Sequence, residues 1–227
     1  RLMCGDSTDE ATVTRLMDGK KAQMFFTDPP YGVDYEGVNN DFLKADQLRQ
    51  FLTLAFKLAY QNLDSASNVY VWHADIHAYE FIGAFRDAGF TQAKPATIQW
   101  VKDSLVLSQG DYHLRNEPCL YGWKQGSNRT RVTDRTQDTI WEFPKPKKAE
   151  GHPTMKPIEL CSRAITNSSL VNQIILDLFG GSGSTLIAAE QTNRTCYMME
   201  LNPKYCDVII KRWEDYTGLK AELVNSK

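Results

Sequence analysis

Two short motifs carry the residues of this 227-residue chain that could do chemistry. In the first, "FFTDPPY" at residues 25–31, an apolar run is followed directly by an aspartate and two prolines. Proline has a fixed φ and no N–H, so we expect a strand to stop at Asp28 and to continue as a stiff, extended turn. That turn would present the Asp28 carboxylate, backbone carbonyls and the Tyr31 ring at the carboxyl end of a strand, where open α/β sheets bind their ligands.

The second motif is "IILDLFGGSGSTLIAAEQTNRTCYMMELN" at residues 174–202. It predicts a strand ending at Asp177, a glycine-rich turn, a helix starting near Ser184 and a second strand ending at Glu200. Glycines allow the backbone to approach a ligand closely, and an acidic residue about 20 positions on can bind ribose hydroxyls, so we expect a nucleoside-like cofactor. A triphosphate loop is excluded because Ser184 stands where that loop needs lysine. A dinucleotide and S-adenosyl-L-methionine both remain open from this motif alone.

Taken together, "DPPY" and "DLFGGSGST" resemble the amino-group DNA methyltransferases, which methylate exocyclic nitrogens of adenine or cytosine with S-adenosyl-L-methionine. The order, with "DPPY" first, resembles the β class of that family. Further matching pieces follow in order, and the resemblance covers nearly the whole chain: "CGDS" at 4–7, "IQWVK" at 98–102, "NEPCLYGWK" at 116–124 and "HPTMKPIEL" at 152–160. The fold it implies is α/β and Rossmann-like, with a mostly parallel seven-stranded sheet and helices on both faces.

The resemblance also implies site residues. The catalytic set would be Asp28, Pro29, Pro30 and Tyr31. The S-adenosyl-L-methionine site would comprise Asp6, Asp28, His152, Thr154, Lys156, Asp177, Phe179, Gly181, Ser182, Gly183, Thr185 and Glu200.

Individual roles follow by position in the motifs. Glu200 would hold the ribose hydroxyls, and Asp6 would meet the adenine edge of the cofactor. From "HPTMKP", His152, Thr154 and Lys156 would lie near the cofactor carboxylate. The structural alternatives are that Asp6 caps a helix before "STDE" and that His152 is an exposed loop residue.

The implied reaction is methyl transfer to the N6 amino group of adenine in DNA. Asp28 and the Pro29 carbonyl would accept N–H bonds from that amino group, and the flipped base would stack on Tyr31. In the resembling family, Asp at the first motif position accompanies adenine and Ser accompanies cytosine. A cytosine-N4 enzyme and a non-catalytic DNA-binding or regulatory subunit are the alternatives. Cys119 in "EPCLY" is interpreted as a buried apolar residue rather than a nucleophile.

A basic segment could contact DNA. Residues 121–148 carry seven Lys or Arg against three Asp or Glu. We expect Arg129, Arg131 and Arg135 to contact DNA phosphates from a small target-recognition lobe, although a solvated loop would explain the same charges. Because this lobe is short, we expect a short or degenerate recognition site.

The elements that must position these residues alternate along the chain. Strand-like runs at "QMFFTD", "NVYVWH", "ATIQWV", "PCLYGW", "QIILDLF" and "TCYMMEL" are mostly separated by helical periodicity, which predicts a largely parallel sheet. The helix after Asp46 should bury a stripe of Leu48, Phe51, Leu52, Ala55, Leu58 and Ala59. The helix capped by Asn202 and Pro203 should bury Cys206, Ile209, Ile210 and Trp213.

We expect one methyltransferase domain over residues 1–227. Its catalytic half would be 1–101, an irregular strand-plus-loop region would span 102–151 with only one short strand, and the cofactor half would be 152–227. The net charge of −2 argues against a wholly basic nucleic-acid binder.

Composition gives weaker expectations about location and partners. No apolar stretch reaches the roughly 18 residues that span a bilayer, and the first residues lack a signal-peptide pattern. We therefore expect a cytoplasmic protein of bacterial or phage origin with DNA as its partner and no membrane association. Five scattered cysteines suggest no metal site. A homodimer and an additional flanking or partner domain stay open.

Overall fold

A continuous, twisted sheet forms the centre of the molecule. The computed structural model describes residues 1–34, 39–107, 111–126, 129–146 and 155–224. Within these ranges the sheet has eight strands in the order β1 (Leu2–Cys4), β8 (Thr195–Glu200), β7 (Ile174–Asp177), β2 (Ala22–Thr27), β3 (Leu63–Trp72), β5 (Leu114–Trp123), β4 (Thr91–Val106) and β6 (Ile140–Glu142).

Most strand pairings in this sheet are parallel. Only β5 runs antiparallel to its neighbours β3 and β4 among the described strands. The expected Rossmann-like α/β fold is therefore confirmed, but the expected count of seven strands is wrong. The strands that sequence patterns did not indicate, β1 and β6, have three residues each, too few for a recognisable alternation. Each is held by its neighbour, as in the pairing of Trp141 with Trp100.

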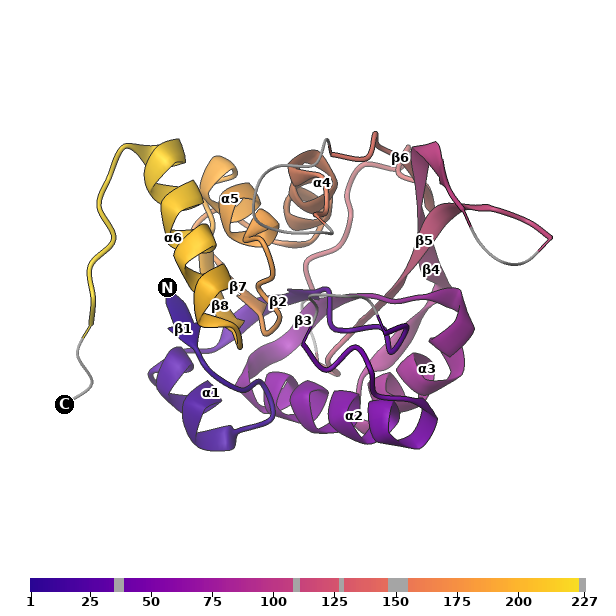
Figure 1. Ribbon diagram of the computed structural model, residues 1–227. Coiled ribbons are helices and arrows are strands. Elements are labelled where there is room, and N and C mark those ends of the chain that lie inside the picture. The colour runs from indigo at the N-terminus through magenta and orange to yellow at the C-terminus, as the bar shows by residue number, and fades with distance from the viewer. Residues whose placement is uncertain (35–38, 108–110, 127–128, 147–154, 225–227) are drawn as a thin grey trace.

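Helices cover both faces of the sheet (Figure 1). One face carries α1 (Glu10–Met17), α2 (Ala45–Asn62) and α3 (Ala78–Asp87), the last preceded by the short 3-10 helix η1 (Asp75–His77). The other face carries α4 (Ile158–Ser168), α5 (Ser184–Gln191) and α6 (Pro203–Thr217). Consecutive strand residues point to opposite faces, so Phe25 joins the core under α2 while Phe26 joins the core under α4. Within the described ranges, no helix has the length and apolarity needed to cross a bilayer.

The two expected helical stripes are present with small differences. In α2 the stripe is buried except for Phe51, which is half-buried because it lines an open cleft, where its ring lies 5.8 Å from that of Phe179 between centroids. In α6 the Asn202 side chain accepts from the Lys204 N–H at 3.0 Å, as a helix cap does. The stripe of α6 is narrower than expected, since only Cys206 and Ile209 are buried, while Trp213 is half-buried and Ile210 is 36% exposed. Its helix covers the border of the sheet beside β1 and therefore buries a narrower face.

The order in which the chain adds strands to the sheet reverses between β2 and β7. From β2 the chain passes through α2 to β3, whereas from β7 it passes through α5 to β8 on the other side. The carboxyl ends of two such strands enclose the crevice in which open α/β sheets bind ligands. Both sequence motifs leave the sheet there, because Asp28 follows β2 and Asp177 ends β7.

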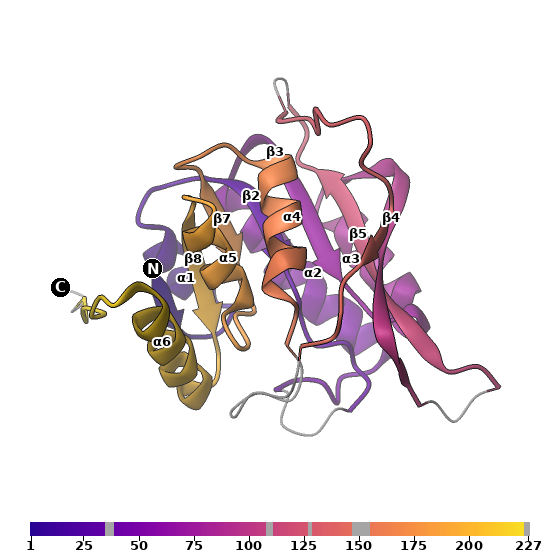
Figure 2. The ribbon, with the colours of Figure 1, turned by 90° about the horizontal axis from the view of Figure 1, so that it is seen from above.

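Residues 102–151 are more regular than expected. They contain the end of β4, all of β5, and β6. The far ends of β4 and β5 project beyond the rest of the sheet as a two-stranded hairpin (Figure 2). The strands of the expected catalytic and cofactor halves are interleaved, since β8 and β7 of the cofactor half lie between β1 and β2 of the catalytic half. The sheet is therefore continuous across both halves.

Candidate active site

The turn after β2 is fixed by one buried aspartate. Oδ1 of Asp41 accepts from the Tyr31 N–H at 2.6 Å and from the Gly32 N–H at 2.9 Å. Gly32 has a φ of +77°, and a Cβ there would lie 2.5 Å from the Leu43 carbonyl oxygen. Only glycine fits this close approach. Both prolines of the motif are buried, so the turn is rigid on each side of its carboxylate.

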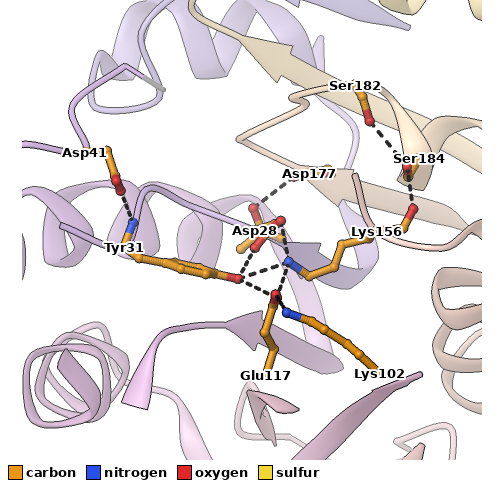
Figure 3. Close-up of polar contacts among 10 residues, drawn as sticks. Asp28, Tyr31, Asp41, Lys102, Glu117, Lys156, Asp177, Ser182 and Ser184 are labelled. Carbon is orange, nitrogen blue, oxygen red and sulfur yellow. Dashed lines mark hydrogen bonds and ion pairs between the residues drawn. The ribbon is translucent and has the colours of Figure 1, made fainter. Parts of the chain in front are cut away.

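A chain of alternating charges surrounds Asp28 (Figure 3). The Tyr31 hydroxyl donates to Asp28 Oδ1 at 2.5 Å, and Lys156 Nζ lies 2.7 Å from Asp28 Oδ2. The same ammonium lies 2.9 Å from Glu117 Oε2 and donates to the Tyr31 oxygen at 3.0 Å. Lys102 forms an ion pair with the other oxygen of Glu117. Four charged side chains from four segments thus meet at one point.

Ionisation within this cluster follows from its charges. Burial opposes ionisation of Glu117, yet Lys156 and Lys102 lower its pKa to about 2. Burial also opposes the charged form of Lys156, but Asp28 and Glu117 raise its pKa above the usual value. Burial, with the two carboxylates, raises the pKa of Tyr31 well above its usual value, so its hydroxyl stays neutral and donates to Asp28.

Asp177 lies next to this cluster, at the end of the neighbouring strand β7. Its Oδ1 accepts from the Thr27 hydroxyl at 2.9 Å and from the Phe179 N–H at 3.1 Å. Burial raises the pKa of Asp177 to about 7, against the opposing hydrogen bonds from Thr185, Phe179 and Thr27. The carboxyl group therefore titrates near neutral pH.

Glu200 anchors the glycine-rich turn. The Gly181 N–H donates to its Oε2 at 2.7 Å, and the Asn202 N–H donates to its Oε1 at 2.8 Å. Burial raises the pKa of Glu200 despite these hydrogen bonds. Each carboxylate oxygen can accept a further hydrogen bond, so Glu200 could still bind a pair of hydroxyls. Gly183 packs instead against Ile209, with a φ of +81°, and does not line the cleft.

The remaining residues of the expected site share one open cleft. Its lining includes Asp6, Asp28, Pro29, Pro30, Tyr31, Lys156, Asp177, Phe179, Gly181, Ser182, Thr185 and Glu200. The cleft combines a buried carboxylate, backbone donors and an aromatic wall at Phe51, a set of groups that fits an adenosine with an amino-acid tail. His152 and Thr154 lie outside the described residues. The individual roles of the cleft residues remain predictions.

Two of the expected details need adjustment. Asp6 does not cap a helix, because Asp9 caps α1, while Asp6 Oδ1 accepts from the N–H and the hydroxyl of Thr8 at 2.8 Å each. The Lys156 ammonium contacts Asp28 and Tyr31 of the turn after β2 and Glu117 of β5, rather than the glycine-rich turn. Cys119, interpreted as a buried apolar residue, is fully buried in β5, and burial raises its pKa well above the usual value.

Sequence reasoning missed three residues of this site. Asp41, Lys102 and Glu117 were not expected there, although Lys102 and Glu117 lie inside motifs that carried the family resemblance. Their charges come together only when β4 pairs with β5 and when the segment before α2 folds back on the turn. The available signal was a charged residue next to an apolar strand, which is common at strand ends.

The expected DNA-contacting arginines do not gather at the cleft. The Arg129 guanidinium stacks 3.9 Å from the centre of the Trp123 ring and donates to the Tyr121 hydroxyl at 3.4 Å. Trp123 pairs with Asn68 in the middle of β3, about 20 Å along β5 from Glu117. Arg129 is therefore at the opposite edge of the sheet from the cleft. Arg131 and Arg135 are exposed, and their contact with DNA remains a prediction.

Comparisons with known proteins agree with this geometry. The family model described as DNA methylase matches residues 22–212. The chain is 22% identical to the DNA adenine methyltransferase YhdJ of Escherichia coli (strain K12), covering 94% of this chain and 83% of that protein.

Two solved structures share the fold. The M1.HpyAVI-SAM complex aligns with a TM-score of 0.72 at 19% identity, covering 93% of this chain and 98% of the other. The cytosine-N4-specific PvuII DNA methyltransferase aligns with a TM-score of 0.72 at 16% identity, covering 93% and 85%.

We expect Asp177 to make stability depend on pH. Its folded pKa of about 7 lies above the usual value of 3.8, so between these values the folded protein binds one more proton than the unfolded chain. The free energy of unfolding should therefore fall by about 3 kcal/mol from pH 5 to pH 8 relative to Asp177→Asn. Urea unfolding of both proteins at several pH values measures this. Equal pH dependence in the two proteins would contradict it.

We expect Arg129→Ala to reduce stability and leave DNA binding unchanged. Losing the stacked guanidinium should cost about 1 kcal/mol, or about 2 to 4 °C in Tm. The slope of log Kd for DNA against log salt concentration should stay the same. For the Tm measurement, Arg131→Ala, which removes an exposed arginine, is the matched control. A slope reduced by about 0.9 would instead place Arg129 on a phosphate.

Proposed function

Since this chain belongs to the DNA methylase family, we propose that it transfers a methyl group from S-adenosyl-L-methionine to the exocyclic N6 of adenine in DNA. The observation that carries this proposal is the Asp28 carboxylate, held by a rigid turn in the same cleft as the glycine-rich turn and Glu200. One cleft thus combines an acceptor for an amino group with a site for a nucleoside cofactor.

Asp28 and the Pro29 carbonyl act as preorganised acceptors. An exocyclic amino group is conjugated with its ring, so its nitrogen lone pair is a poor nucleophile. Two acceptors that take its N–H bonds draw the nitrogen toward tetrahedral geometry and direct the lone pair at the methyl group. Asp41 fixes the turn through two backbone N–H groups, so the backbone that carries the two acceptors needs little reorganisation during the reaction.

The cofactor side of the cleft is built from the ends of β7 and β8. Glu200 would accept hydrogen bonds from the two ribose hydroxyls, while the backbone of the glycine-rich turn would surround the amino-acid tail. Asp6 lines the same cleft and would meet the adenine edge. When bound, S-adenosyl-L-methionine supplies an electrophilic methyl group on a sulfonium.

The base would enter the same cleft from the other side. DNA is the partner in this proposal. Because a target base stacked in a duplex is inaccessible, the base must be flipped out. Tyr31 lines the cleft, and its ring is held edge-on against Phe81 at a centroid distance of 6.2 Å. It would provide one stacking face for the flipped base.

The preference for adenine rests on the first residue of the motif. Asp28 stands where the resemblance associates aspartate with adenine N6 and serine with cytosine N4. The relative YhdJ is described as a DNA adenine methyltransferase, which supports the same choice, whereas the PvuII enzyme is specific for cytosine N4. Nucleoside analysis of methylated DNA distinguishes the two products.

We expect the purified chain to produce N6-methyladenine in DNA and Asp28→Ala to lose this activity. Removing one preorganised acceptor typically lowers turnover on the order of 100-fold or more. DNA incubated with S-adenosyl-L-methionine is digested to nucleosides and quantified by mass spectrometry. Asp46→Ala, which removes an exposed aspartate from the start of α2, is the matched control. N4-methylcytosine as the product would refute the adenine assignment, and an Asp28→Ala variant above about a tenth of wild-type turnover would refute the role of Asp28.

We expect Glu200→Ala to weaken binding of S-adenosyl-L-methionine by about 10- to 100-fold, because charge-assisted hydrogen bonds worth roughly 1.5 to 3 kcal/mol are lost. Calorimetric titration measures the change, and the exposed Glu222→Ala serves as control. Since Glu200 also anchors Gly181 and Asn202, Tm is compared without cofactor. An unchanged cofactor Kd would remove Glu200 from the cofactor site.

A further inference from the structure

Both oxygens of Asp28 are already engaged. Oδ1 accepts from the Tyr31 hydroxyl, and Oδ2 is paired with Lys156 at 2.7 Å. The Lys156 side chain is 9% exposed, and its three N–H groups meet three acceptors in Asp28, Glu117 and Tyr31. A target amino group can therefore bind Asp28 only if the ammonium shares or releases that carboxylate.

Glu117 is the group that can retain this ammonium. Its Oε2 lies 2.9 Å from Lys156, and its Oε1 is paired with Lys102, whose side chain is only 6% exposed. Glu117 and Lys102 lie on the paired strands β5 and β4, and the Lys102 ammonium also lies 5.0 Å from the Trp100 ring centre. The second carboxylate is thus fixed by regular structure, while Lys156 reaches it from the segment before α4.

We propose that Glu117 is a positioning residue for methyl transfer. It holds Lys156 when Asp28 turns from its ion pair to the target amino group, and it balances the positive charge of Lys156 beside the transferred methyl. This inference rests on the proposed role of Asp28 as acceptor.

Charge balance gives the proposal a measurable consequence. Asp28, Lys156, Glu117 and Lys102 alternate in sign and sum to zero charge. In the reaction the amino lone pair forms the N–C bond, the electrons of the broken C–S bond stay on sulfur, and one amino proton passes to water. Positive charge thus moves from sulfur to nitrogen within the cleft. An uncompensated positive charge in the cluster would disfavour both the bound sulfonium and the transition state.

Two ligands that differ by one methyl cation measure this effect without any reaction. S-adenosyl-L-methionine carries the sulfonium charge, whereas S-adenosyl-L-homocysteine is a neutral thioether. The ratio of their Kd values therefore reports the electrostatic potential at the methyl position, and effects on the shared adenosine and amino-acid contacts cancel.

Matched variants of Glu117 and Lys102 change the cluster charge in both directions. Glu117→Gln leaves one extra positive charge and should raise the ratio of Kd for S-adenosyl-L-methionine to Kd for S-adenosyl-L-homocysteine by about 3- to 10-fold. Lys102→Met should lower the ratio. The double variant Glu117→Gln/Lys102→Met should return the ratio to the wild-type value, a rescue that damage to packing would not produce.

Turnover provides the second readout. With saturating S-adenosyl-L-methionine, Glu117→Gln should slow single-turnover methylation of DNA about tenfold or more, and Glu117→Asp, which keeps the charge, should retain more of the rate. Tm measurements identify any variant that fails to fold. If Glu117→Gln does not fold, Lys102→Met alone tests the sign of the predicted change in ratio.

The outcomes separate this proposal from the function it rests on. The role of Glu117 would be overturned if the folded single variants Glu117→Gln and Lys102→Met kept the Kd ratio within twofold of wild type. A single-turnover rate of Glu117→Gln within twofold of wild type would also overturn it. Such results in an enzyme that still produces N6-methyladenine leave the proposed function intact. If the wild-type chain makes no methylated base but the Kd ratio follows the cluster charge, the proposed reaction fails while the charge coupling stands.

Discussion

The parallel pairing of β2 with β7 is the constraint on which the whole site depends. Phe25 lies in register with Leu176, and the Thr27 hydroxyl donates to Asp177 at 2.9 Å across 150 residues of sequence. The chain leaves these neighbouring strands in opposite directions, so none of the described helices covers their carboxyl ends. The turn carrying Asp28 and the glycine-rich turn therefore open into one cleft although the sequence separates them widely.

The cleft keeps its charges by pairing each with an opposite charge. Burying an isolated carboxylate or ammonium is costly, and buried charges persist when partners and hydrogen bonds satisfy them. Lys156 meets this condition through three acceptors, and Glu117 through two ammonium groups. Asp177 has hydrogen-bond donors but no cation within its contacts in the described residues, and its pKa rises to about 7. Two cations thus lower the pKa of Glu117, whereas burial without a contacting cation raises the pKa of Asp177.

Local patterns predicted the elements that carry the two motifs and the cleft they share. The prolines after Asp28, the glycines after Asp177 and the Asn202 cap act within a few residues of their own position, so their effects can be predicted from the sequence. The short strands β1 and β6 and the role of Glu117 depend on long-range pairing, which no local pattern records. The contact of Arg129 with DNA stays a prediction, and its stacking on Trp123 could not be foreseen, because a basic run does not reveal at which edge of the sheet it folds.

The sheet divides the site between its parallel and antiparallel parts. The proposed cofactor side is built from the ends of β7 and β8, whereas Lys102 and Glu117 come from the antiparallel pair β4 and β5. Lys156 joins the two parts, since its ammonium contacts Glu117 while its carbonyl accepts from the Ser184 hydroxyl at the start of α5 at 2.9 Å. The segment before α4 therefore links the helix that follows the glycine-rich turn to the carboxylate cluster.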